Sequence, residues 1–124
     1  MRIEYYGSAK ITYFDKEAVW KALRELAPRL AQEHPEVIKV AVFGSLARDE
    51  AVPGSDVDLL LILRESSLPL PDRFSKYRPE RFRVCVEVFA YTLDEVKERL
   101  SEGDFFLKRA LSEAVTLFER DEGQ

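Results

Sequence analysis

Residues 40–63, VAVFGSLARDEAVPGSDVDLLLIL, decide the fold of this chain. The apolar run Val40–Phe43 predicts a buried strand that ends at Gly44, and the residues after it predict a short helix over Leu46–Arg48 with Ser45 as its N-cap. A helix N-terminus presents free backbone N–H groups, and a glycine beside it has no Cβ to keep an anion away. This part of the chain is therefore a candidate site for phosphate.

Two aspartates follow in the second half of the same stretch. Pro53-Gly54 predicts a turn, and the apolar residues beyond it predict a second strand that runs from Ser55 to Arg64. Because side chains alternate along a strand, Asp56 and Asp58 are expected to project from the same face. Two carboxylates placed in this way can share metal ions.

The pattern Gly-Ser-x-Ala-Arg followed by Ser-Asp-x-Asp-Leu, over Phe43 to Leu63, resembles the signature of the DNA polymerase β-like nucleotidyltransferases. The short chain around it is similar to their minimal nucleotidyltransferase subgroup. The resemblance implies an α+β fold, in which a small mixed β-sheet carries helices on one face and the active site on the other. The chain departs from the family pattern at Asp49, where glycine is usual after the arginine.

A third strand is predicted over Arg83–Tyr91, where apolar and other residues alternate. The apolar set is expected to face the helices: Val84, Val86, Val88 and Ala90. Glu87 then lies on the opposite face, with the two aspartates. The resemblance implies a third carboxylate on this strand, usually an aspartate, and glutamate is one methylene longer. The alternative is an exposed glutamate at the sheet edge, without a role.

The resemblance also implies a reaction and a set of site residues. It implies transfer of a nucleoside monophosphate, most often AMP from ATP, to a hydroxyl group. Two Mg²⁺ ions, for which Mn²⁺ can substitute, would be held by Asp56, Asp58 and Glu87. Four residues are assigned to the nucleotide: Gly44, Ser45, Arg48 and Ser55. For Arg48 an exposed ion pair with a neighbouring acid is the alternative.

Weaker patterns predict the remaining elements. They are a hairpin or extended arm over Ile3–Tyr13 with aromatic contacts, a helix over Lys16–Glu33 with Asp15 as its N-cap, a strand over Val37–Phe43, a helix over Leu93–Leu100 opened by a Thr92–Glu95 capping box, a helical face over Phe105–Leu111, and a short β segment over Val115–Glu119.

The segment Glu65–Glu80 contains three prolines and predicts a long loop. Over Asp72–Arg83, five basic residues stand against two acidic ones, and aromatic residues lie between them. Such a basic patch could hold a triphosphate or an acidic partner, and a solvated loop with aromatic anchors is the equal alternative.

Composition limits the class of protein. With 124 residues the chain is expected to form one domain, residues 1–124, and its net charge of −4 argues against a dedicated nucleic-acid binder. Cys85 is the only cysteine, which excludes an internal disulfide and a cysteine-based zinc site. No signal peptide and no membrane-spanning run is apparent, so a cytoplasmic protein is expected.

His34 is the only histidine, and with Arg29 it reproduces a spacing used by the ribonuclease toxins of the HEPN family. We assign it no role, because the two residues end a helix beside a nucleotidyltransferase motif and a solvated histidine is the simpler interpretation.

Three functions agree with these patterns. The first is an enzyme that adenylylates a tyrosine of a helical HEPN-type partner, as the resemblance to minimal nucleotidyltransferase antitoxins implies. The second is a non-catalytic subunit that caps a partner. The third is a small-molecule nucleotidyltransferase that needs a helical domain from a partner. The nucleotide base, the acceptor and the presence of a homo-oligomer are left open.

Overall fold

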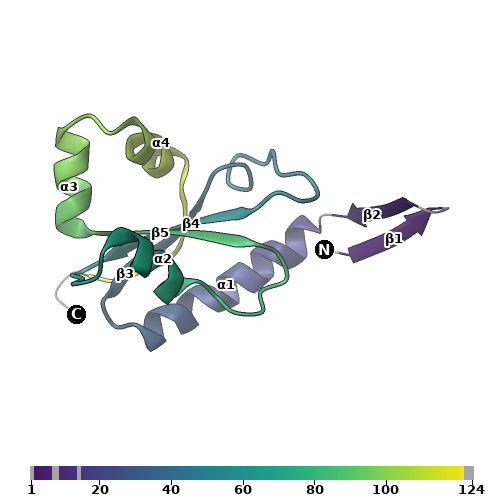
Figure 1. Cartoon of the computed structure of the whole chain (residues 1–124), viewed down its shortest axis with the longest axis horizontal. Helices are drawn as coiled ribbons and strands as arrows, with labels where there is room; N and C mark the ends of the chain where they lie inside the picture. Colours follow the sequence, from purple (N-terminus) through teal and green to yellow (C-terminus); the bar gives the residue numbers. More distant parts are fainter. Residues whose placement is uncertain (1, 7–8, 14, 122–124) are drawn as a thin grey trace.

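The computed structural model describes residues 2–6, 9–13 and 15–121, with side chains for residues 15–121. Figure 1 shows the elements in order. They are β1 (Arg2–Tyr6), β2 (Ala9–Tyr13), α1 (Lys16–Glu33), β3 (Val37–Phe43), β4 (Val57–Leu63), α2 (Leu70–Tyr77), β5 (Val86–Thr92), α3 (Leu93–Ser101), α4 (Phe105–Glu113) and β6 (Val115–Glu119). No described helix has the length and apolar character needed to cross a membrane.

The main sheet has four strands in the order β5-β4-β3-β6. β4 and β5 run parallel, whereas β3 is antiparallel to both β4 and β6. The predicted mixed sheet in an α+β fold is therefore confirmed. β1 and β2 form a separate antiparallel hairpin, as the sequence predicts; the tip at 7–8 and the aromatic contacts expected of the arm lie outside the described residues or side chains.

One face of the sheet packs against α1. Val19, Leu23 and Ala27, which recur at helical spacing along α1, are at most 1% exposed. They join the alternate residues of the strands in one core: Val57, Leu59, Leu61 and Leu63 from β4, and Val84, Val86, Val88 and Ala90 from β5 and the residues before it. The predicted parity of both strands is confirmed, which fixes the faces on which their polar residues lie.

The opposite face is covered in part by α3 and α4. Leu60 and Ile62 of β4 pack there with Val96 of α3 and Leu107 of α4. The continuous apolar run of β4 agrees with this arrangement, because a strand buried on both faces needs apolar residues at every position. The part of this face that α3 and α4 leave uncovered carries Asp58 and Glu87.

The prediction of a long loop over residues 65–80 is wrong, because α2 occupies Leu70–Tyr77. Pro69 stands at its N-cap position and Pro71 within its first turn, where a missing N–H breaks no helical hydrogen bond. The prolines that indicated a loop therefore begin a helix. Tyr77 is buried at its end and donates a hydrogen bond to Glu36.

Smaller differences concern strand starts and His34. β4 begins at Val57 rather than Ser55, and β5 at Val86 rather than Arg83. His34 is the C-cap of α1, and its ring packs edge-on against Tyr77 at 4.8 Å between ring centres. It is thus a half-buried packing residue rather than the solvated one that was expected.

Candidate active site

The chain turns sharply after β3. Gly44 has a φ of 78°, the Arg48 N–H donates to the Gly44 carbonyl at 3.1 Å, and the Glu50 N–H donates to that of Ser45 at 2.8 Å. The predicted short helix is wrong. The chain makes a single turn here, because Asp49 adopts a left-handed φ of 59°, which ends the helical conformation. Aspartate tolerates this conformation. This explains how it stands where the family pattern has glycine.

Gly44 lies directly beneath Asp58. Phe43 and Asp58 are register partners of β3 and β4, and a Cβ added at Gly44 would lie 2.3 Å from Asp58 Oδ2. A side chain at position 44 is therefore unfavourable for two reasons: the positive φ of the backbone, and the clash of its Cβ with the Asp58 carboxylate. The turn that could bind phosphate and the strand that could bind metal touch at this point.

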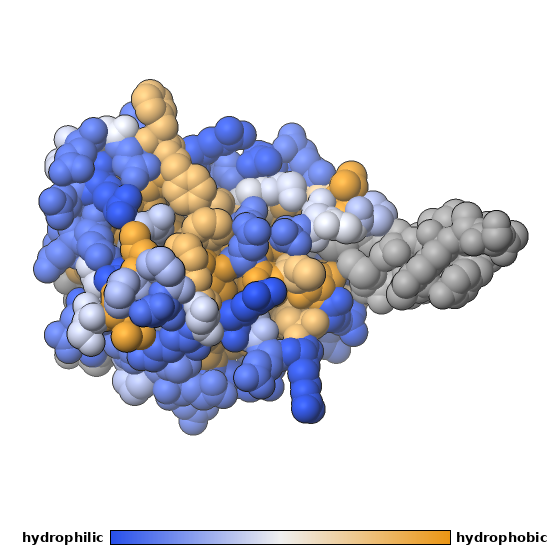
Figure 2. All heavy atoms as spheres, in the orientation of Figure 1, coloured by the Kyte–Doolittle hydropathy of each residue, from blue (hydrophilic) through white to orange (hydrophobic). Residues whose placement is uncertain are grey.

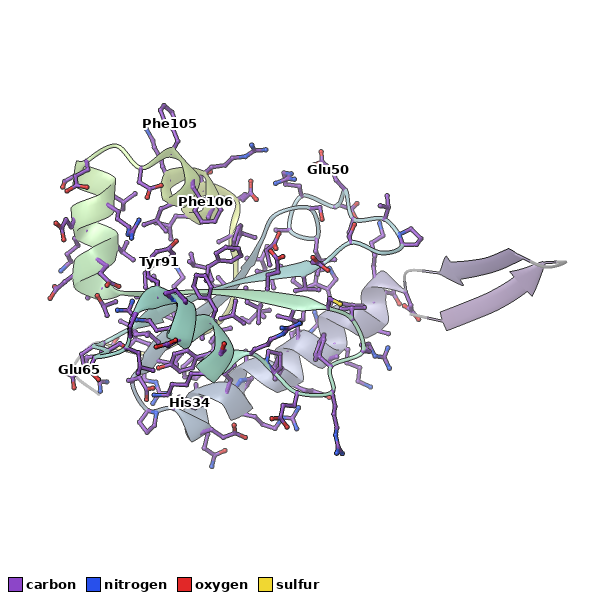
Figure 3. The ribbon with its side chains drawn as sticks, viewed as in Figure 1. His34, Glu50, Glu65, Tyr91, Phe105 and Phe106 are labelled. Carbon is purple, nitrogen blue, oxygen red and sulfur yellow. The ribbon has the colours of Figure 1, made fainter. Side chains whose placement is uncertain are left out.

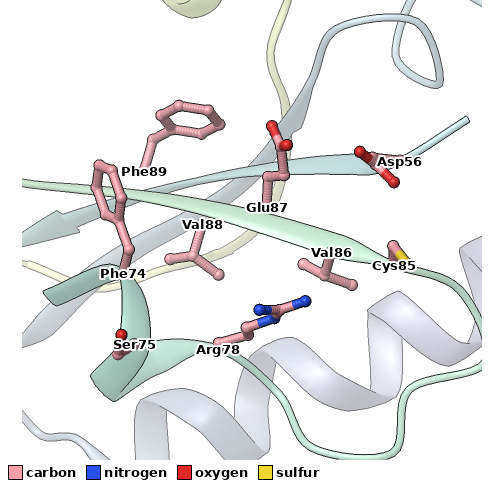
Figure 4. A pocket seen from close by; sticks show the side chains of 9 residues that line it. All are labelled: Asp56, Phe74, Ser75, Arg78, Cys85, Val86, Glu87, Val88 and Phe89. Atoms are coloured by element: carbon pink, nitrogen blue, oxygen red, sulfur yellow. The ribbon is translucent and has the colours of Figure 1, made fainter. Parts of the chain in front are cut away.

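The three predicted carboxylates come from adjacent strands. Asp58 and Glu87 are register partners in the parallel pair β4–β5, and Asp56 lies just before β4. Figure 4 shows Asp56 and Glu87 along one pocket of about 450 Å³. Burial, followed by the charges of Glu87 and Asp56, raises the pKa of Asp58 from 3.8 to about 6. Negative charge is thus concentrated here, and the nearby Arg48 guanidinium offsets it only in part.

Among the residues that the structure describes, no three His, Cys, Asp or Glu side chains are already arranged to hold a metal ion. The donors nonetheless fit magnesium chemically, because it is a hard cation that prefers carboxylate oxygen and retains waters. Burial, followed by the charges of Glu87 and Asp56, raises the pKa of Asp58, and a bound cation would favour its ionised form.

The residues assigned to the nucleotide divide into two places. Gly44, Ser45 and Arg48 line one pocket together with Asp58. Ser55 lies in another pocket with Asp56, and its hydroxyl accepts a hydrogen bond from the Val52 amide at 3.0 Å. Its hydroxyl therefore closes the turn before β4.

Glu113, the last residue of α4, also belongs to this site, and sequence reasoning missed it. Its Oε2 accepts hydrogen bonds from the Gly44 N–H at 2.5 Å and from Arg48 Nη1 at 2.8 Å. Burial acts to raise the pKa of Glu113, but these two hydrogen bonds hold it below its usual value. No local pattern could have shown this, because 69 residues separate Glu113 from Gly44.

The basic patch predicted over Asp72–Arg83 is only partly beside the site. Arg73 is 5% exposed and forms a bidentate pair with Glu95 at 2.5 and 3.0 Å, so it cannot reach a ligand. Lys76 pairs with Glu36 at 3.2 Å and lines a different pocket from that of Asp56 and Glu87. Arg78 does line the pocket with Asp56 and Glu87, as Figure 4 shows.

Aromatic side chains border the carboxylates. The ring centres of Phe43, Phe74 and Phe106 each lie 5.3–5.5 Å from that of Phe89. Phe105, at the start of α4, is 86% exposed and points away from the fold (Figure 3). Figure 2 shows that apolar surface extends from this end of α4 across the middle of the same face. An apolar surface therefore adjoins the acidic site.

Comparison with known proteins gives a consistent result. The family model described as "Nucleotidyltransferase domain" matches residues 23–120. The chain is similar to a crystal structure of a putative nucleotidyltransferase from Sulfolobus solfataricus, with a TM-score of 0.58, 19% identity and coverage of 85% of this chain and 84% of that one. It is also similar to a crystal structure of a toxin-antitoxin with AMP-PNP, with a TM-score of 0.55, 12% identity, and coverage of 81% and 76%. No curated protein matches the sequence.

Proposed function

Because the chain belongs to the nucleotidyltransferase domain family, we propose that this nucleotidyltransferase moves AMP from ATP to a tyrosine hydroxyl of a separate HEPN-type partner. The observation that carries the proposal is the contact between the two halves of the site. The Asp58 carboxylate lies against the Gly44 turn, and Glu87 is its register partner. The carboxylates that would bind metal and the donors that would bind phosphate can therefore contact the same triphosphate.

In the proposed reaction, Asp56, Asp58 and Glu87 hold two Mg²⁺ ions. When bound, such ions polarise the α-phosphate, neutralise the leaving pyrophosphate and lower the pKa of the acceptor hydroxyl. The chain's own contribution is to fix Asp58, whose position is set by the sheet register and by Gly44. Asp56 and Glu87 are exposed, so they are free to turn toward the ions.

The triphosphate is assigned to the turn after β3. The Gly44 N–H, the Ser45 hydroxyl and the Arg48 guanidinium are donors that line one pocket with Asp58. A guanidinium suits phosphate because its N–H groups match two oxygens at once. Ser55 is placed to support Asp56 by holding the turn before it, rather than by a contact with phosphate.

The proposed acceptor hydroxyl belongs to another molecule. We assign it to a helical partner for two reasons. The exposed Phe105 and Phe106 offer apolar area beside the acidic site, and such area on a small protein is typical of a binding surface. The similar solved structure described as a toxin-antitoxin with AMP-PNP combines a partner with an ATP analogue on a related fold, which favours the same pairing here.

The test is transfer to the product of the adjacent gene. The two chains are co-expressed and purified through a tag on one of them, and the partner is weighed by intact mass spectrometry and mapped by peptide sequencing. We expect AMP-sized additions on a tyrosine that disappear with Asp56→Asn and with Asp58→Asn. Asp94→Asn, an exposed residue in the first turn of α3, is the matched control and should leave transfer unchanged.

Two other outcomes have clear meanings. A partner that is neutralised equally well by all three variants, and never gains mass, would refute catalysis and favour a capping subunit. Additions on a small molecule but not on the partner would favour a small-molecule nucleotidyltransferase that borrows a helical domain.

A further inference from the structure

The phosphate donors of the site are already occupied by a side chain of the protein itself. A single oxygen, Oε2 of Glu113, accepts from the Gly44 N–H at 2.5 Å and from Arg48 Nη1 at 2.8 Å. These are two of the donors that the proposed function assigns to the triphosphate. A carboxylate and a phosphate oxygen use the same kind of charge-assisted hydrogen bond, so the two anions compete for the same place.

The position of Glu113 is not explained by a favourable contribution to the stability of α4. It is the last residue of α4, where the helix dipole disfavours a negative charge, and no basic residue stands in that last turn. Among the described side chains, its other oxygen makes only a longer contact, 3.5 Å, with the exposed Arg109. Its charge also adds to the repulsion that raises the pKa of Asp58. The hydrogen bonds that Glu113 accepts from Gly44 and Arg48 offset these unfavourable contributions to stability.

Arg48 is further restrained by Glu50, whose Oε1 accepts from Arg48 Nε at 2.7 Å. The two carboxylates differ in one useful respect. The Glu113 side chain is 14% exposed and also accepts from the Gly44 amide, whereas the Glu50 side chain is 63% exposed and, in the part of the chain that the structure describes, accepts only from the guanidinium. Glu50 is therefore a natural comparison for Glu113.

We propose that Glu113 is an internal substitute for phosphate, which holds the Gly44 amide and Arg48 in the nucleotide-free protein and must withdraw before a triphosphate binds. This inference rests on the proposed function, since it concerns the same phosphate site. Its consequence is a lower apparent affinity for nucleotide, because only the fraction of molecules with Glu113 withdrawn is competent to bind. Glu113 thus sets the threshold of nucleotide concentration at which the enzyme loads.

The experiment is calorimetric titration of the full chain with inorganic tripolyphosphate and, separately, with ATP, both in excess Mg²⁺. Four proteins are compared: wild type, Glu113→Ala, Glu113→Gln and Glu50→Gln. We expect Glu113→Ala to bind both probes about tenfold more tightly than wild type. Glu113→Gln keeps an uncharged acceptor and should fall between the two, and Glu50→Gln should remain within about twofold of wild type, because exposed ion pairs contribute little.

Each result decides the matter. Equal or weaker binding by Glu113→Ala, or a Glu50→Gln variant that tightens as much, would overturn the inference. If Glu113→Ala does not fold, as circular dichroism would reveal, Glu113→Gln carries the test alone, with tighter binding expected. Failure of every protein to bind ATP would overturn the proposed function as well. Tight binding by Glu113→Ala without AMP transfer to any partner would refute the proposed acceptor and leave the role of Glu113 standing.

Discussion

Replacement of Asp58 by asparagine is expected to stabilise the metal-free protein. The Asp58 carboxyl is half-buried, and its pKa rises from 3.8 to about 6, first through burial and then through the charges of Glu87 and Asp56. Above its pKa the folded protein must keep this charge in an unfavourable place, while the unfolded chain exposes it to water. Asparagine has nearly the same shape and no charge, so the substitution removes the penalty.

The magnitude follows from the two pKa values. A difference of about 2 pKa units corresponds to about 3 kcal/mol at 1.36 kcal/mol per unit. Because the carboxyl is only partly buried, solvent screening lowers this figure, and we expect about 1–2 kcal/mol. For a domain of this size that is a rise of about 4–8 °C in the midpoint of thermal unfolding.

The sign of the pH dependence is equally specific. The raised pKa means that the folded state holds the proton more tightly than the unfolded chain does. The favourable contribution of Asp58 is therefore complete below pH 3.8 and is lost as the pH rises through about 6. The stability difference between Asp58→Asn and wild type should vanish near pH 4 and reach its full value above about pH 7.

The assay is urea unfolding followed by circular dichroism, with chelator present, at several pH values between 4 and 8. Asp56→Asn is the matched control: it changes an exposed carboxylate of the same site and should alter the free energy of unfolding by less than about 0.5 kcal/mol. A destabilised Asp58→Asn, or a difference that does not depend on pH, would refute the electrostatic reasoning and make Asp58 a structural residue.

Two further predictions concern single contacts. Gly44→Ala should lose more stability than Gly103→Ala, since both have a left-handed φ but only the first places a Cβ against Asp58 Oδ2, whereas nothing lies within 4 Å at the second; equal midpoints in calorimetric scans would contradict this. Glu95→Ala should destabilise the fold by about 2–3 kcal/mol in chemical unfolding, because it leaves the buried Arg73 charge without its partner; a loss below about 0.5 kcal/mol would show that Arg73 finds another partner.

Local patterns predicted much of this molecule. The bounds of α1, β3 and β6 follow from helical spacing, the Asp15 cap and apolar runs, and the Thr92–Glu95 capping box is formed as expected. The common face of Asp58 and Glu87 follows from strand parity, because a period of two leaves no other choice once the buried set is known. These features depend on neighbours in the sequence.

The features that the sequence did not predict depend instead on residues that are far apart in the chain. The sequence did not reveal α2, because prolines occur both in the first turn of a helix and in loops. Only the burial of the far end of α2 against the sheet distinguishes the two cases. One member of the predicted basic patch, Arg73, is withdrawn from it for a reason that the sequence does not show, since the Arg73–Glu95 pair joins residues 22 positions apart. Glu113 could not be found at all, because its partners Gly44 and Arg48 are 69 and 65 positions away in the sequence.

The charge arrangement of the site gives these separate observations one physical cause. Burial and the charges of Glu87 and Asp56 raise the pKa of Asp58, and Glu113 accepts the hydrogen bond of the Gly44 amide. A metal–triphosphate complex acts on both places at once: its cations neutralise the carboxylates around Asp58, and its phosphates can replace Glu113 at Gly44. Metal alone would leave Glu113 at Gly44, and triphosphate alone would leave the carboxylates around Asp58 without the bound cations. Binding of the two components should therefore be coupled, each increasing the affinity for the other by the same factor.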